Sequence, residues 1–320
     1  AATPVTIDGC EVDVTLANGD PLPDGAIVPR DTTTTDGHYV KVGKATGSSD
    51  CVLEFVQPMV EMKWMFPYPL DELHVLVVGG GGAGSRGGGG AGGFYDTFSD
   101  PGNPALSTPD GAVSATIRVG RGGSAPSGNQ SGENGADSGI FFSTFAGVVG
   151  DRLYDGGTEA PKKPEVASDA VVMAGGGGGS KETGRGENGG SGGGSVNAGT
   201  SGANGGSGLQ DAADSGVRYG NSGGGANGCN NGTDDDRGGS GGGGAGGAGG
   251  KPNCDNTVGG TGGAGQASSI TGTSRTYAGG GGGSFEGGGG VVSGGAGGGG
   301  QGDNNGASAM DGEDGLGGGG

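Results

Sequence analysis

Apolar and polar residues alternate near the start of the chain with the period of two that a half-buried β-strand requires. Within residues 11–16, Val12, Val14 and Leu16 alternate with Glu, Asp and Thr, so one side of the segment is expected to face a core. The same pattern, separated by loops rich in Gly, Pro, Asp and Thr, predicts three further strands, at residues 39–42, 51–56 and 60–66. We therefore expect a small all-β domain over residues 1–73.

Beyond residue 73 the pattern changes, because short apolar runs are followed directly by runs of glycine. The runs at 75–78 and 171–174 have the length of strands, and glycine stretches of four or more residues follow both. Six of the 93 glycines lie at positions 1–73 and the other 87 lie beyond them. The sequence therefore predicts a second module, a glycine-rich bundle over residues 74–320.

This composition excludes several classes of protein. With 93 Gly and 14 Pro among 320 residues, an enzyme with a large aliphatic core is not expected. Glycine comes in runs rather than at every third position, which excludes collagen. Chains of this kind are also typical of disorder, so an ordered fold needs another source of stability.

Polyglycine II is a conformation that could order such runs. This extended left-handed helix has three residues per turn and no internal hydrogen bonds, so its N–H and C=O groups point outward to neighbouring helices. Without Cβ atoms the helices can approach until their backbones bond to one another. We expect a bundle of polyglycine II helices with a few short strands and essentially no α-helix.

The charge is strongly acidic, with 35 Asp and Glu against 16 Lys and Arg and a formal net charge of -19. Such a surface repels phosphate backbones and anionic lipid, so nucleic-acid partners are not expected. No apolar run approaches the length of a membrane span.

The four cysteines form two well-separated sequence pairs, Cys10 with Cys51 and Cys229 with Cys254. There is no C-x-x-C spacing and the chain has only two histidines, so disulfides in an oxidising compartment are favoured over a zinc site. The start at Ala1 in place of an initiator Met fits a secreted chain whose signal peptide has been removed.

The motifs that would indicate a catalytic or cofactor-binding site are incomplete in this sequence. Gly79, Gly81 and Gly84 match the dinucleotide fingerprint, but the glycines that follow cannot propagate the helix on which its phosphate binding depends. His74 lacks a nearby partner, and a structural role is favoured over a catalytic one. The segment with Trp64 and Tyr68 is either an exposed aromatic patch or, as we favour, part of the core or of the junction with the next module. We assign no catalytic, cofactor-binding or metal-binding residue and expect no cofactor.

Calcium binding and N-glycosylation are two further kinds of site that the sequence raises. Two acidic clusters offer oxygen ligands for weak calcium binding: residues 234–236, and residues 303–305 together with Asp311, Glu313 and Asp314. Neither matches a calcium-loop pattern, and solvated turns are favoured. Asn129 and Asn231 begin N-x-S/T sequons, which matter only if the source glycosylates exported proteins.

The order of these segments resembles a known family. The run VLVVGGGGAG at 75–84, GGGGAGGF at 87–94 and ATIRVGRGG at 115–123 are similar to the glycine-rich domains of bacterial and phage surface proteins, including tail-fibre adhesins. The resemblance covers about residues 74–320 and implies a sandwich of glycine helices whose tip loops bind receptors. Residues 1–73 have no counterpart in it.

Three non-enzymatic functions remain open. The first is a structural subunit of an extracellular filament or surface appendage, which assembles with copies of itself into a homopolymer. The second is an adhesin that binds a receptor or glycan through loops such as 94–106, 153–166 and 210–219. The third, ice binding, needs a flat regular face that the charged loops here do not favour.

Overall fold

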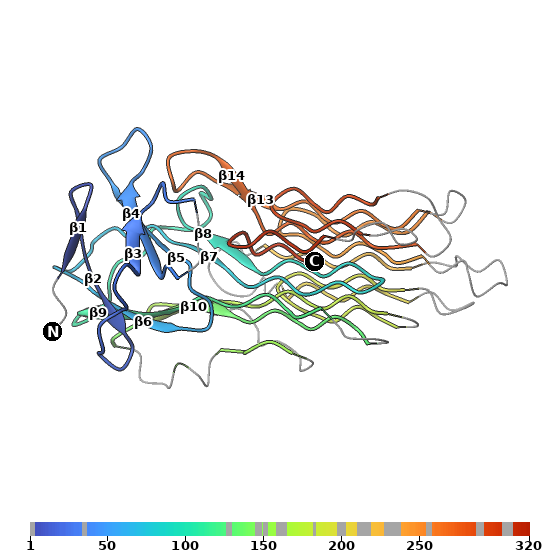
Figure 1. The fold of residues 1–320 in the computed structure, drawn as a ribbon, viewed down its shortest axis with the longest axis horizontal. Coiled ribbons are helices and arrows are strands. Elements are labelled where there is room, and N and C mark those ends of the chain that lie inside the picture. Colours follow the sequence, from blue (N-terminus) through green and yellow to red (C-terminus); the bar gives the residue numbers. More distant parts are fainter. Residues whose placement is uncertain are drawn as a thin grey trace.

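The computed structural model of the chain is elongated (Figure 1), with the β-strands gathered at one end and glycine-rich segments running side by side along the long axis. The structure describes residues 4–33, 37–125, 130–144, 149, 153–157, 165–181, 184–196, 203–209, 219–226, 238–253, 258–285, 291–302 and 310–320. Over these residues the regular elements are β-strands, and none is an α-helix. The expectation of an all-β chain with essentially no α-helix is confirmed for this part of the protein.

Fourteen strands form among the described residues, and six of them correspond to the apolar segments predicted from the sequence. They are β1 (Val5–Ile7), β2 (Cys10–Leu16), β3 (Ile27–Pro29), β4 (Val40–Lys44), β5 (Cys51–Phe55), β6 (Glu61–Met65), β7 (Leu76–Val78), β8 (Phe94–Asp96), β9 (Ser114–Arg118), β10 (Ser138–Phe142), β11 (Glu165–Ala167), β12 (Ala170–Met173), β13 (Gln266–Ser268) and β14 (Arg275–Tyr277). The four strands predicted within residues 1–73 correspond to β2, β4, β5 and β6, and the two apolar runs before glycine correspond to β7 and β12.

The largest sheet has seven strands in the order β1-β2-β6-β9-β10-β12-β11, and each neighbouring pair is antiparallel. Strands β1, β2 and β6 come from the part of the chain before residue 73, and the other four come from beyond it. The change in composition at residue 73 therefore does not separate two sheets. The division into two domains stays a prediction.

Two apolar clusters stabilise the end of the molecule where the strands gather, which we call the strand end. One lies between β2, β4 and β6 and contains the buried residues Cys10, Val12, Val14, Val40, Val42 and Met62. The other packs β9, β10 and β12 against the β7-β8 hairpin, with Ile117, Ile140, Val171 and Met173 in its centre. Trp64 packs against both clusters, so the preferred prediction that this residue lies in the core or at the junction is confirmed.

Beyond the strands, the glycine segments are held together by hydrogen bonds between backbones. In the segment 174–181, N–H groups three residues apart donate to the same neighbour: Gly176 to Gly80 and Gly179 to Ala83, and likewise Gly177 to Ser191 and Ser180 to Gly194. Carbonyls of this segment accept at the same interval: Gly177 from Gly90 and Ser180 from Gly87. Each segment therefore bonds to several others, and the contact to each neighbour repeats every three residues.

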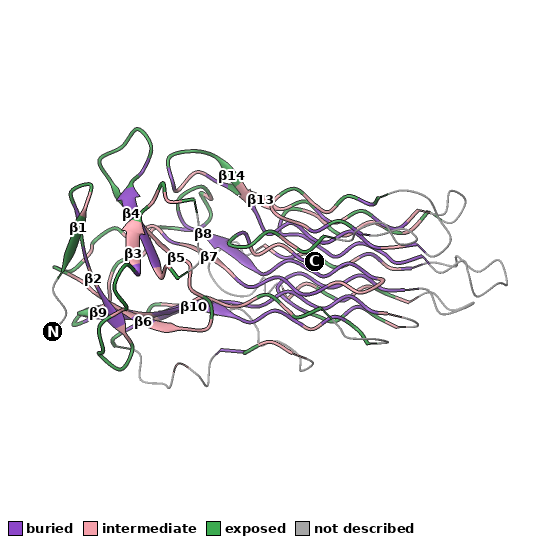
Figure 2. Ribbon diagram, in the orientation of Figure 1, coloured by how far each residue is buried: buried purple, intermediate pink, exposed green. Residues whose placement is uncertain are grey.

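Close approach of the backbones explains why these positions are glycine. A Cβ atom added at Gly242 would fall within 3.0 Å of the carbonyl of Gly89 and the nitrogen of Gly90. Figure 2 shows the inner segments as buried and the outer ones as intermediate or exposed. The inner segments have no space for side chains, because their neighbours occupy it with backbone atoms.

We predict that Gly242→Ala destabilises the protein by at least the roughly 1–3 kcal/mol typical of overpacking. The matched control is Gly122→Ala, because a Cβ there has its nearest non-neighbouring atom, the Gly81 oxygen, at 3.7 Å and no positive φ opposes it. This control is expected to be neutral or to stabilise by about 0.4–1 kcal/mol through the unfolded state. Thermal and denaturant unfolding measure both, and equal stabilities for the two variants would contradict the account.

Tyr219 joins the outer segment 219–226 to the strand end. Its phenol donates to Asp100 Oδ2 at 2.8 Å, and its ring meets Phe94 edge-on with centroids 5.9 Å apart. Burial, followed by the hydrogen bond to the Asp100 carboxylate, raises the pKa of Tyr219 from 10.0 to about 12. The protonated phenol is therefore the form that stabilises the folded state.

Since the folded pKa of Tyr219 is raised, its stabilising effect is complete below pH 10 and is lost as the pH rises through about 12. Tyr219→Phe is expected to lower stability at neutral pH and to remove this part of the alkaline pH dependence. Denaturant unfolding across the alkaline range measures the effect, and Tyr68→Phe, at a ring that is 67% exposed, is the control. An unchanged alkaline profile in Tyr219→Phe would disprove the role.

Candidate functional site

The described structure contains a long cleft of about 2400 Å³. It starts at the strand end, between β5 and β7, and continues along the glycine segments. Its walls include four parts of the chain that lie far apart in the sequence: residues 51–58, 76–86, 118–123 and most of 310–320. No single stretch of sequence could have predicted it.

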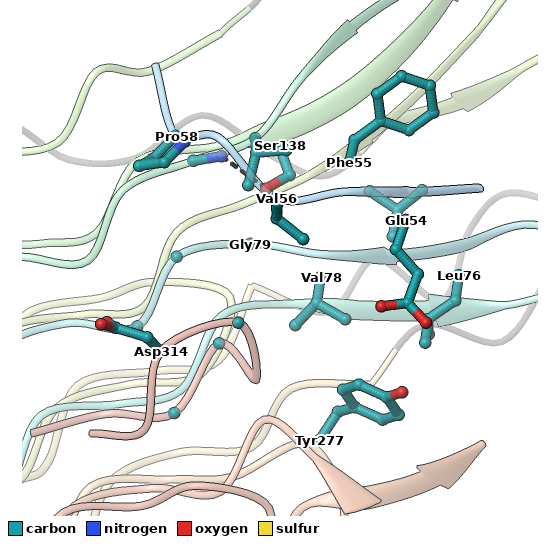
Figure 3. A pocket seen from close by; sticks show the side chains of 18 of the residues that line it. Glu54, Phe55, Val56, Pro58, Leu76, Val78, Gly79, Ser138, Tyr277 and Asp314 are labelled. Atoms are coloured by element: carbon teal, nitrogen blue, oxygen red, sulfur yellow. Dashed lines mark hydrogen bonds between the residues drawn. The ribbon is translucent and has the colours of Figure 1, made fainter. Parts of the chain in front are cut away.

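At the strand end the cleft is lined by side chains (Figure 3). Glu54 and Val56, at the end of β5, face Leu76 and Val78 across the opening, and Tyr277 of β14 lies beyond them. Four of these five side chains are apolar or aromatic, and the fifth is an acid. Burial is the main cause that raises the pKa of Tyr277, so its phenol remains protonated at neutral pH.

Arg30 fixes the wall of the cleft near β5. Its Nε donates to Glu54 Oε1 at 2.9 Å, its Nη1 to the Lys44 carbonyl at 2.7 Å and its Nη2 to the Thr271 carbonyl at 3.0 Å. The backbone N–H of Thr46 also donates to the Thr271 carbonyl at 3.0 Å. The three-stranded sheet β3-β4-β5 is thereby tied to the loop between β13 and β14, a part of the chain far away in the sequence.

Along the bundle the cleft is lined mainly by backbone. The segments 79–84 and 119–123 form one side and the segment 310–320 the other, and most of these residues are glycine. Such a surface offers many backbone N–H and C=O groups, beside the charged side chains of Arg121, Asp311, Glu313 and Asp314. It can recognise a ligand by hydrogen bonds to backbone groups.

Two exposed aromatic rings lie at the strand end of the cleft. Tyr68 is 67% and Phe98 49% exposed, and both line it. The Phe98 ring meets His74 edge-on at 5.1 Å between centroids. Nδ1 of His74 lies 3.0 Å from the Thr97 carbonyl and Nε2 lies 3.2 Å from Glu72, so both ring nitrogens already have partners. These contacts support the structural role favoured for this histidine.

Two arginines that line the cleft are paired with acids. Arg118, which is buried, pairs with Asp155, and Arg275 pairs with Glu313 at 3.5 Å while its guanidinium lies 5.7 Å from the ring centroid of Tyr277. The exposed pair contributes little to stability.

Cys10 and Cys51 form a disulfide with a Cα–Cα distance of 5.8 Å, which confirms the first predicted pair. It links β2 to β5, and Cys51 lies at the edge of the cleft. The second pair, Cys229 and Cys254, lies outside the described residues, as do the sequon residues Asn129 and Asn231.

Of the acidic clusters, 234–236 and 303–305 lie outside the described residues, while Asp311, Glu313 and Asp314 line the cleft. In the part of the chain that the structure describes, no group of three or more His, Cys, Asp or Glu could hold a metal ion. The same described residues contain no helix with the length and apolarity that crossing a membrane demands.

No family model, curated protein or solved structure matches this chain. The resemblance of residues 74–320 to glycine-rich surface domains therefore remains a prediction from the sequence.

We predict that Arg30→Ala loosens the wall of the cleft, because it removes three hydrogen bonds and leaves Glu54 without its cation. Stability should fall by about 1–3 kcal/mol, and hydrogen exchange should accelerate at the amides of Thr46 and Gly272, which bond within this region. Arg30→Lys is the control that keeps the charge but loses the forked geometry, and we expect an intermediate effect. If exchange at these amides matched that of the unmodified protein, Arg30 would not hold the wall.

Proposed function

We propose that the chain is a non-enzymatic structural subunit of an extracellular filament or surface appendage. The observation that carries the proposal is the backbone hydrogen-bond network, which repeats every three residues between glycine segments along the long axis of the molecule. A bundle held in this way resists bending, because displacement of one segment breaks bonds to several others. Stiffness along one axis is what a filament needs from its subunit.

The same repeat supports polyglycine II as the conformation of the segments. A helix with three residues per turn returns each N–H to the same direction after three residues, so it bonds to one neighbour at that interval. Glycine without space for a Cβ, as at Gly242, is what close packing of such helices requires.

Several features favour assembly with copies of the same chain. Strands β1 and β11 are the edges of the seven-stranded sheet and β5 is an edge of the three-stranded one, so backbone groups of all three can pair with another chain. The disulfide between Cys10 and Cys51 fits an oxidising, extracytoplasmic compartment.

An adhesin is the second candidate. The observation that favours it is the pair of exposed rings, Tyr68 and Phe98, at the strand end of the cleft. Aromatic rings that remain exposed on a rigid scaffold are suited to pack against the apolar face of a sugar or against a receptor. In this case the protein would act as a monomer or a small oligomer.

Electron microscopy of the purified protein over a concentration series tests the proposal. We expect regular fibres of constant width, and we expect Gly242→Ala to lose the fibres together with its thermal stability. Dispersed particles at every concentration, combined with binding to glycans that Tyr68→Ala and Phe98→Ala abolish, would replace the filament by the adhesin.

A further inference from the structure

The cleft along the bundle lies where one more glycine segment would fit, and its walls carry the hydrogen-bonding groups that such a segment would need. This follows from the directions in which the segment 79–84 bonds to its neighbours. Its N–H groups fall into three sets, each repeating every third residue. Two sets are paired: Gly79 and Gly82 donate to Gly93 and Gly90, and Gly80 and Ala83 donate to Ala136 and Glu133.

The third set consists of Gly81 and Gly84, whose N–H groups have no hydrogen-bond partner among the described residues. The carbonyls of the same segment are paired in all three of their directions. Gly80 and Ala83 accept from Gly176 and Gly179, Gly82 accepts from Gly320, and Gly81 accepts from Gly123. The segment therefore has five bonded neighbours and one open direction.

The open direction points into the cleft. With three residues per turn, donor directions alternate with acceptor directions around the segment axis. The two paired donor directions lead to the segments 90–93 and 133–136, so the third lies between the remaining neighbours, 317–320 and 121–123. Residues of both these neighbours line the cleft, as do Gly81 and Gly84.

The facing wall offers the complementary group. In the segment 317–320 the carbonyls of Gly317 and Gly320 accept from Gly92 and Gly89, and that of Gly319 accepts from Gly300. The carbonyl of Gly318, which lines the cleft, accepts no hydrogen bond from the described residues. An occupant of the cleft would therefore accept from Gly81 and donate to Gly318, as each glycine segment already does with its own neighbours.

We propose that the cleft receives an outer glycine segment from the bundle of a second copy of this chain, a statement that rests on the proposed assembly into filaments. The chain carries suitable outer segments. In 258–265, Thr261 and Ala264 are exposed, lie three residues apart and have backbone N–H groups without a partner among the described residues. The carbonyl of Gly262, between these two residues, also accepts no hydrogen bond from the described residues. The segment therefore has small exposed side chains, donors for the Gly318 carbonyl and an acceptor for the Gly81 N–H.

Gly122→Trp tests the proposal by placing a large side chain in the cleft. A Cβ at Gly122 has its nearest non-neighbouring atom at 3.7 Å, so the fold should tolerate the substitution. The matched control is Gly184→Trp, at a glycine that does not line the cleft and whose Cβ would lie 3.8 Å from Ser180 Cβ. Sedimentation velocity over a concentration series measures association, electron microscopy shows fibres, and thermal unfolding verifies that both variants fold.

We expect Gly122→Trp to weaken association at least tenfold and to lose fibres, with its unfolding temperature unchanged, while Gly184→Trp assembles like the unmodified protein. If the unmodified protein forms fibres and Gly122→Trp forms them equally well, the cleft proposal is wrong and the filament proposal stands. If the unmodified protein stays monomeric at every concentration, both proposals are wrong. Binding of an oligosaccharide by that monomer, abolished by Gly122→Trp, would assign the cleft to a carbohydrate instead.

Should Gly122→Trp fail to fold, Gly122→Cys labelled with a nitroxide gives the same decision. Assembly is expected to immobilise the label at this position and to leave a label at Gly184→Cys mobile. A label that stays equally mobile at both positions in assembled protein would overturn the proposal.

Discussion

The structure depends on pairing the polar groups of a backbone that carries almost no side chains. An ordinary domain orders its chain by burying apolar side chains, whereas the inner segments here can offer only N–H and C=O groups. Ordering glycine costs more conformational entropy than ordering any other residue, so many hydrogen bonds must form together. Their repeat at every third residue lets one segment bond to several neighbours at once.

The strands determine which segments become neighbours. Strands β7, β9, β12 and β14 lead directly into glycine segments, and β8, β10 and β13 follow directly from them. The apolar cluster that packs β9, β10 and β12 against the β7-β8 hairpin thus aligns the segments at their bases. Side-chain packing supplies the register at one end, and backbone hydrogen bonds extend it along the bundle.

The same physics connects the fold with its proposed assembly. A lattice of backbone bonds has no intrinsic limit at the surface of one molecule, because outer segments and open positions keep unpaired groups. Edge strands create the same condition in a sheet. The cleft beside Gly81 and Gly318 is bordered both by an edge strand and by glycine segments. At one end β5 adds apolar side chains to its wall, and along the rest of its length the wall is mainly glycine backbone.

The sequence by itself determined some of the local elements. The alternation at residues 11–16 predicted β2, because the side chains of a half-buried strand follow a period of two. The apolar run at 75–78 predicted β7, because a short apolar run has the length of a strand. The cysteine spacing similarly indicated the bridge between Cys10 and Cys51.

Only the tertiary structure decided how these elements combine. It placed β6 beside β9 in one sheet across the change in composition, and it brought Glu54, Tyr277 and Asp314 around one cleft. Glycine runs have no side-chain pattern from which neighbours can be inferred, so the sequence could not say which segments bond or where a position stays open. That information lies in the directions of backbone N–H and C=O groups, which are fixed only when the segments pack.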